Sequence, residues 1–153
     1  MITAWRIVKK QNAAGAFDGE GARLFGGRWN SPGVPVVYLA STRALAALEM
    51  AVHLDRWTLL ASFVLIPCDF EQRLVTTIDS SALPMDWRRN PPPLALAIIG
   101  DQWVDQAHSA VLAVPSALIE EETNFLLNPR HRDFFRIRIG SPQRFEFDPR
   151  LIK

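Results

Sequence analysis

The glycines of this chain are gathered in one segment, which limits where regular core elements can lie. Six of the eight glycines fall within residues 11–33, and glycine accommodates backbone conformations that other residues avoid. The run Ser31-Pro32-Gly33 is typical of a tight turn. We therefore predict a loop over 11–33 that leads into an apolar strand over 34–40. Arg28 in the loop and Tyr38 in the strand, the only tyrosine, would then lie at the two ends of one unit, an arrangement suited to a ligand with a phosphate and a flat ring.

Length and charge favour one globular domain without a general affinity for polyanions. The 153 residues are expected to form a single domain, 1–153, and the net charge of +1 favours neither nucleic acid nor an anionic membrane. Cys68 is the only cysteine, which excludes an intrachain disulfide and a thiolate cluster. The apolar stretch 58–66 is too short to cross a bilayer. Residues 1–10 lack the pattern of a signal peptide, so we expect a cytoplasmic protein without membrane association.

Periodic apolar positions predict short strands and two main helices. The strands are expected over 2–8, 34–40, 60–66, 74–79 and 110–114, with 67–71 as a break, and in a C-terminal antiparallel pair, 134–139 with 144–147. The helices are expected over 42–54, after Ser41 as N-cap, over 94–107, with Leu94, Ile98 and Val104 or Trp103 buried, and briefly within 120–127. This mixture, without a repeat or linker, predicts an α+β fold.

Several familiar kinds of site are excluded by their missing motifs. The glycines do not form Gly-x-Gly-x-x-Gly, and the chain has neither Gly-Lys-Ser/Thr nor Gly-x-Ser-x-Gly. The three histidines, His53, His108 and His131, fall in separate predicted elements without metal-ligand spacing. We therefore expect no metal site. The basic residues from Arg130 to Arg138 are better explained as protection of an edge strand than as a nucleic-acid surface.

Two candidate ligand-binding residues come from the loop–strand unit itself. Arg28 could fork onto a pyrophosphate, although taken alone it is better explained by a surface salt bridge. Tyr38 could stack on a ring or bind a ribose, or it could be a core tyrosine with its hydroxyl at the rim.

Glu49 and Ser116 are the other two main candidates. Glu49 borders the apolar face of the predicted helix over 42–54, where its carboxylate could meet a sugar hydroxyl or a developing cation, or simply pair with His53. Ser116 follows a predicted strand and could lie in a site or only cap a turn. Secondary candidates are Arg6, Arg23 and Asn128.

Taken together, these residues resemble the RES domain, the toxin half of RES–Xre toxin–antitoxin pairs. The resemblance is carried by seven ordered segments: Trp5-Arg6, Gly26-Gly-Arg-Trp-Asn30, Val37-Tyr-Leu-Ala40, Leu48-Glu49 with His53, Gly100-Asp-Gln-Trp103, Val114-Pro-Ser116 and Asn124-x-Leu-Leu-Asn-Pro-x-His131. The chain has Arg132 where the family usually has a proline.

The resemblance implies an ADP-ribosyltransferase-like fold, with a split β-sheet core, flanking helices and a cleft for NAD as substrate. It places the catalytic set on Arg28, Tyr38, Glu49 and Ser116, with Arg6 and Asn128 as further NAD contacts. The implied reaction breaks the nicotinamide–ribose bond, with inorganic phosphate or water as acceptor. An Xre-type DNA-binding antitoxin is the implied partner, and a homo-oligomer stays open. A protein-modifying mono-ADP-ribosyltransferase and a non-catalytic binding module on the same fold are the alternatives.

Overall fold

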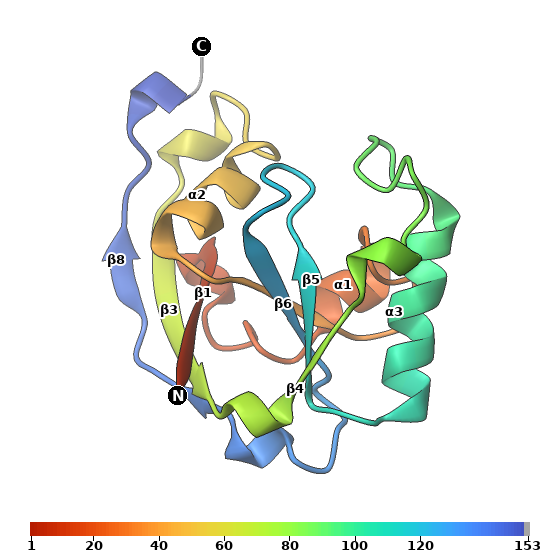
Figure 1. The fold of residues 1–153 in the computed structure, drawn as a ribbon. Helices are drawn as coiled ribbons and strands as arrows, with labels where there is room; N and C mark the ends of the chain where they lie inside the picture. Colours follow the sequence, from red (N-terminus) through yellow and green to blue (C-terminus); the bar gives the residue numbers. More distant parts are fainter. Residues whose placement is uncertain (152–153) are drawn as a thin grey trace.

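The fold is built on one mixed eight-stranded sheet, seen in a computed structural model that describes residues 1–151. The strands are β1 (Ile2–Lys9), β2 (Val37–Ala40), β3 (Phe63–Phe70), β4 (Val75–Thr77), β5 (Val111–Pro115), β6 (Thr123–Leu127), β7 (Arg138–Ile139) and β8 (Gln143–Phe145). Their order is β4-β5-β6-β2-β1-β3-β7, and β8 also pairs with β3 (Figure 1). Only the β4–β5 pair is parallel among these strands. The predicted α+β class is confirmed.

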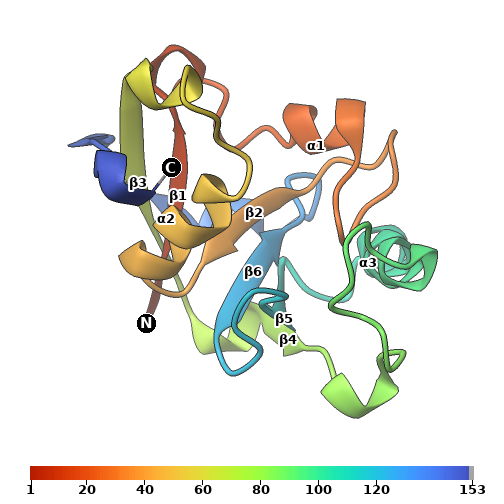
Figure 2. The same cartoon turned by 90° about the horizontal axis from the view of Figure 1, so that it is seen from above.

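Three α-helices flank the sheet: α1 (Glu20–Phe25), α2 (Arg43–Ala51) and α3 (Leu94–Gln106). Figure 2 shows α2 beside β1 and β3, whereas α3 lies beyond β5 at the other side. Leu45 and Ala46 of α2 are buried against β1 and β3, and Leu96 and Trp103 of α3 are buried against β5 and β6. No helix within residues 1–151 has the length and apolar character needed to span a bilayer.

The contact between α3 and the glycine-rich loop is unusually close. A Cβ atom on Gly100 would lie 1.7 Å from the backbone oxygen of Trp29. Trp29 is itself buried in the same apolar cluster as Leu96 and Trp103. Gly100 therefore lets α3 pack directly on the loop backbone, which fixes the loop that carries Arg28.

Two local predictions for the first third of the chain are wrong. The predicted loop over 11–33 contains α1, which follows Gly19 in the left-handed conformation (φ 74°) and ends at Gly26 (φ 71°). Helix α2 begins after Thr42 rather than Ser41, because the Thr42 hydroxyl accepts a hydrogen bond from the amide of Leu45 at 3.0 Å. The glycines therefore delimit a short helix instead of preventing one.

Three pairing predictions are also wrong. Strand β3 continues through Pro67, since this residue pairs with Trp5 of β1 and its own oxygen accepts from the amide of Gly140. Residues 123–127 form β6, not a helix, because β2 and β5 pair with it on both sides. The two C-terminal strands each pair with β3 rather than with one another.

The buried face of α3 also differs from the predicted one. Leu94 and Ile98 are exposed, and Leu96, Ala97, Gly100 and Trp103 are buried instead. The helix is apolar on nearly every side, so its composition does not define a single core face. Close packing at Gly100 selects the face.

Candidate active site

The centre of the candidate site is the carboxylate of Glu49, which lies in the last turn of α2. Its Oε1 accepts two hydrogen bonds, from Ser116 Oγ at 2.6 Å and from Asn124 Nδ2 at 2.7 Å. Ser116 directly follows β5 and Asn124 lies in β6, whose register pairs it with Val114. Both donors hold Oε1. Oε2 receives no hydrogen bond from the described residues and is therefore left for a ligand. The alternative partner, His53, does not pair with it.

Ser116 is fully buried, and its hydroxyl is fully engaged. It donates to Glu49 and accepts from the amides of Leu118 at 3.1 Å and Ile119 at 3.3 Å, while its own amide donates to the oxygen of Glu122 at 2.9 Å. Ser116 therefore does both things considered from the sequence: it caps a turn, and it lies in the candidate site.

Asn124 is a site residue for which the sequence predicted no role. Its amide must point Nδ2 at Glu49, because the reverse orientation would place an oxygen against a carboxylate. Its Oδ1 is consequently buried without a hydrogen-bond partner, which costs about 1–3 kcal/mol for a group of this kind. The motif that begins at Asn124 could have marked it as a site residue. A helix within 120–127, as predicted, gives no indication that Asn124 contacts Glu49.

Tyr38 secures the glycine-rich loop with its hydroxyl. The phenol donates to Asn30 Oδ1 at 2.7 Å and accepts from the amide of Trp29 at 3.1 Å. Burial raises the pKa of Tyr38 well above its ordinary value. A Cβ on Gly27 would lie 2.7 Å from this hydroxyl, so the loop needs glycine there. Loop and strand thus form the one unit that the sequence predicted, joined by Tyr38 itself.

Arg28 lies in this loop, close enough to Glu49 for the two charges to interact. Its Nη1 donates to the backbone oxygens of Trp87 at 2.9 Å and Arg89 at 3.0 Å. Partial burial lowers the pKa of Arg28, and the nearby charge of Glu49 opposes that shift. Nε and Nη2 make no hydrogen bond within residues 1–151, and no carboxylate there forms an ion pair with Arg28. The guanidinium is thus oriented and still has donors for an anion.

The segment that holds Arg28 is joined to the turn that follows Ser116. Arg88 donates from Nε to the oxygen of Ala117 at 3.0 Å and from Nη2 to the oxygen of Leu118 at 3.1 Å. The loop, this segment, the turn and α2 therefore form a connected frame around Glu49.

The secondary candidates have different surroundings. Arg6 donates to the backbone oxygens of Ala16 at 2.6 Å and Tyr38 at 3.0 Å, and burial lowers its pKa to about 10. Arg23 pairs with Glu20 on the surface of α1. Asn128 is buried and caps a turn through the amide of Arg130 at 3.0 Å. It follows β6 at the end opposite Asn124, roughly 13 Å away along an extended strand. The structure does not bring Asn128 to Glu49.

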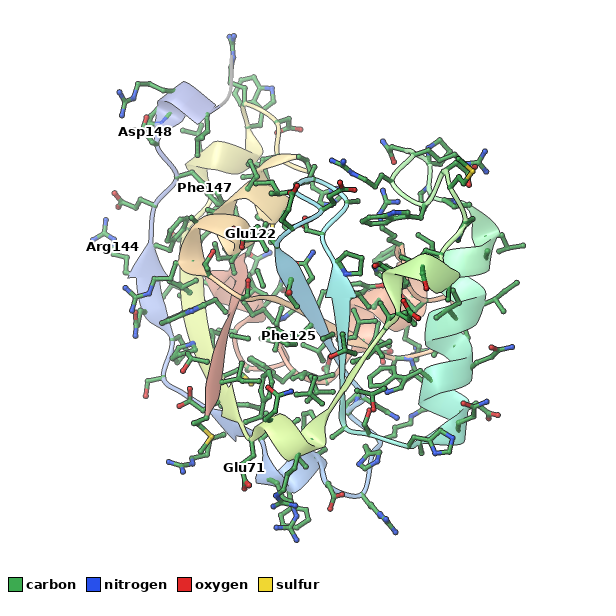
Figure 3. The ribbon with its side chains drawn as sticks, in the orientation of Figure 1. Glu71, Glu122, Phe125, Arg144, Phe147 and Asp148 are labelled. Atoms are coloured by element: carbon green, nitrogen blue, oxygen red, sulfur yellow. The ribbon has the colours of Figure 1, made fainter. Side chains whose placement is uncertain are left out.

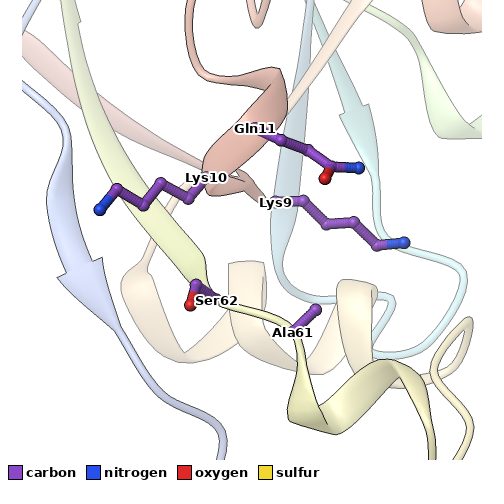
Figure 4. A pocket seen from close by; sticks show the side chains of 5 residues that line it. All are labelled: Lys9, Lys10, Gln11, Ala61 and Ser62. Atoms are coloured by element: carbon purple, nitrogen blue, oxygen red, sulfur yellow. The ribbon is translucent and has the colours of Figure 1, made fainter.

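Two surface hollows differ in their relation to this site. One of about 220 Å³ is lined by Arg28 and adjoins the site. The other, of about 510 Å³, lies at the far end of β1, between Lys9, Lys10 and Gln11 on one side and Ala61 and Ser62 on the other. Figure 4 shows the two lysine side chains pointing away from each other, so they do not converge on one anion. Within the described residues, no group of three or more His, Cys, Asp or Glu side chains could hold a metal ion.

Comparison with known proteins gives consistent matches along nearly the whole chain. "Toxin Res" of Yersinia enterocolitica is 38% identical over 148 residues, covering 96% of this chain and 97% of its own. "Toxin Res" of Photorhabdus laumondii is 37% identical over 151 residues, covering 97% of this chain and 96% of its own. "Prs ADP-ribosylating toxin" of a Sphingobium species is 36% identical over 154 residues, covering 97% of this chain and 96% of its own.

A solved structure shows the same fold. The match is to a chain of the Mycobacterium tuberculosis MbcT–MbcA toxin–antitoxin complex, with a TM-score of 0.73 and 21% identity, over 98% of this chain and 86% of that one. It supports the predicted ADP-ribosyltransferase-like fold. The model of the RES domain matches residues 3–148. The chain therefore belongs to the RES domain family, as its motifs predicted.

Proposed function

We propose that this protein is the toxin of a toxin–antitoxin pair and that it breaks the nicotinamide–ribose bond of NAD. The observation that carries the proposal is the Glu49 carboxylate, held at Oε1 by two donors beside an arginine with free donors. A carboxylate held in this way suits a reaction in which positive charge develops on a sugar. Family membership supports the choice of NAD as the substrate.

In the proposed reaction, the bond between the ribose C1′ and the nicotinamide nitrogen breaks first. The bonding electrons leave with nicotinamide, which becomes neutral, and an oxocarbenium-like ribose remains. Glu49 Oε2 stabilises this charge and accepts from a ribose hydroxyl. An acceptor oxygen then attacks C1′ and gives up its proton, which completes the transfer of ADP-ribose.

The other residues hold the substrate or the carboxylate. Arg28 binds the pyrophosphate through Nε and Nη2, and the ring of Tyr38 packs near the nicotinamide end. Ser116 acts by holding Glu49, since its hydroxyl proton is already donated to that carboxylate. Arg6 is the next candidate for a phosphate contact, because its Nε and Nη1 are occupied by backbone oxygens while Nη2 is not. We leave Asn128 out of the proposed site because of its position.

The first test is the loss of NAD and release of nicotinamide by the purified protein, with and without inorganic phosphate. Phosphate-dependent loss identifies a phosphorylase, and phosphate-independent loss a glycohydrolase. Glu49→Gln keeps the shape of the side chain and removes its charge, and it should lower turnover on the order of 10²–10³-fold. Turnover of Glu49→Gln at the wild-type rate would refute the assignment.

Glu71→Gln is the matched control for this substitution. Glu71 is an exposed glutamate paired with Arg73 at 2.7 Å. Figure 3 shows it at the opposite end of the sheet from Glu122, which lies in the turn beside Ser116. Glu71→Gln should therefore turn over NAD as the wild type does.

A second candidate function is transfer of ADP-ribose to a protein. It is favoured by the Sphingobium relative, which is named as an ADP-ribosylating toxin. Labelled NAD distinguishes the two: label on a protein band supports this candidate, whereas label only in small products supports NAD depletion.

The proposed setting is the cytoplasm, with an antitoxin as partner. The solved relative is a toxin in complex with its antitoxin, and we extend that arrangement to an Xre-type antitoxin for this chain. Expression of this chain alone should arrest a bacterial host and lower its NAD, and co-expression of the cognate antitoxin should restore growth.

A further inference from the structure

The hollow beside Arg28 is lined partly by apolar side chains that the proposed chemistry does not use. It lies between the loop that follows α1 and the start of α3, which Figure 2 shows close together. Phe25 and Pro32 contribute one side, and Pro92, Pro93 and Leu94 the other. Arg28 alone carries a charge among the described residues that line it.

Two of the lining side chains are conspicuously exposed. Phe25 is 84% and Leu94 71% exposed, so neither contributes much to the core. Two large apolar groups at the rim of a hollow are a feature of binding surfaces rather than of ordinary solvated ones. The neighbouring Pro92 and Pro93 restrict the backbone that faces Phe25. The hollow therefore presents exposed apolar side chains to a flat ligand, beside the polar Asn30 and Ser31.

The volume limits what the hollow can bind. At about 220 Å³ it is smaller than the roughly 300–1,000 Å³ of pockets that enclose whole drug-sized ligands. It is sized for one ring system and not for a complete dinucleotide.

The order of groups along the site matches the order of groups in a dinucleotide. Glu49 is close enough to Arg28 to oppose the lowering of the Arg28 pKa, and Arg28 itself lines the hollow. In NAD the reactive ribose is followed by the pyrophosphate and then by adenosine. We propose that this hollow binds the adenine end of NAD, with Phe25 and Leu94 against the ring; the inference rests on the proposed function.

The test compares two substrates that differ only in the adenosine monophosphate half. Phe25→Ala and Leu94→Ala should each lower kcat/KM for NAD, on the order of tenfold for Phe25 from lost stacking on the base. The same variants should leave kcat/KM for nicotinamide mononucleotide unchanged, because that substrate does not reach the hollow. Equal losses on both substrates, or no loss on NAD, would overturn the proposal. Both residues are exposed, so folding should be preserved.

Leu24→Ala is the matched control, because Leu24 is 54% exposed on the same helix and does not line the hollow. It should leave both substrates unaffected. Calorimetric titration with ADP separates this inference from the proposed function, since ADP has no nicotinamide–ribose bond to cleave. ADP binding that weakens in Phe25→Ala but not in Leu24→Ala supports the hollow even if the wild type leaves NAD intact. Absent ADP binding, or equal binding by both variants, counts against it.

Discussion

The hydroxyl of Tyr38 is predicted to stabilise the fold rather than to take part in the chemistry. Tyr38→Phe removes one oxygen and keeps the ring, so apolar packing and any ring contact with substrate are retained. Two buried groups lose their partner: Asn30 Oδ1, which accepts at 2.7 Å, and the Trp29 amide, which donates at 3.1 Å. Both residues are buried, so water cannot readily replace the hydroxyl.

The expected magnitude follows from those two groups. An unpaired buried polar group costs about 1–3 kcal/mol, so the substitution should lower the free energy of unfolding by about 2–6 kcal/mol. A chain of this size loses about 2–4 °C of midpoint per kcal/mol. The thermal midpoint should therefore fall by at least about 4 °C.

Calorimetry and NAD turnover, measured on both proteins well below the lower midpoint, check this reasoning together. We expect a lower midpoint and nearly unchanged turnover per folded molecule. A midpoint within about 1 °C of wild type, combined with a large loss of turnover, would show that the hydroxyl acts in the reaction and that its role as a brace is wrong.

Three further substitutions test other parts of the structure. Gly100→Ala places a Cβ 1.7 Å from the Trp29 oxygen, and should cost at least about 3 kcal/mol in urea unfolding; a loss under about 1 kcal/mol would contradict the close packing. Burial raises the pKa of Cys68 from 9.0 to about 12, so the thiol loses its proton at lower pH in the unfolded chain than in the native one. The free energy of unfolding should therefore fall as pH rises from 9.0 toward 12. Denaturation measured across this pH range should show a smaller fall in Cys68→Ala. Asn124→Leu removes both the donor to Glu49 and the unpaired Oδ1, so kcat should fall on the order of 10–10²-fold with little change in thermal midpoint; wild-type kcat would exclude a role in holding the carboxylate.

Much of the fold was predictable where local pattern and tertiary environment agree. Alternation predicts the strand that begins at Ile2, and the preceding prolines predict the helix that begins at Leu94; both form as predicted. Residues 123–127 differ from the predicted helix because nearby glutamates favour a helix locally, whereas β2 and β5 supply strand partners on both sides. Pro67 predicts a break in the strand, but proline lacks only a hydrogen-bond donor, and the Pro67 oxygen still accepts from the amide of Gly140.

For the candidate site, the sequence by itself determined the motif residues and the family, since Arg28, Tyr38, Glu49 and Ser116 stand at recognisable spacings. Only the tertiary structure decided what these residues do to one another. Oε1 of Glu49 meets Ser116 and Asn124 because β5 and β6 pair in one register and α2 packs against the neighbouring strands. Ser116 is 67 positions from Glu49 along the chain, and Asn124 is 75 positions from it. Their hydrogen bonds to Glu49 depend on that register, and no local pattern of side chains encodes the register.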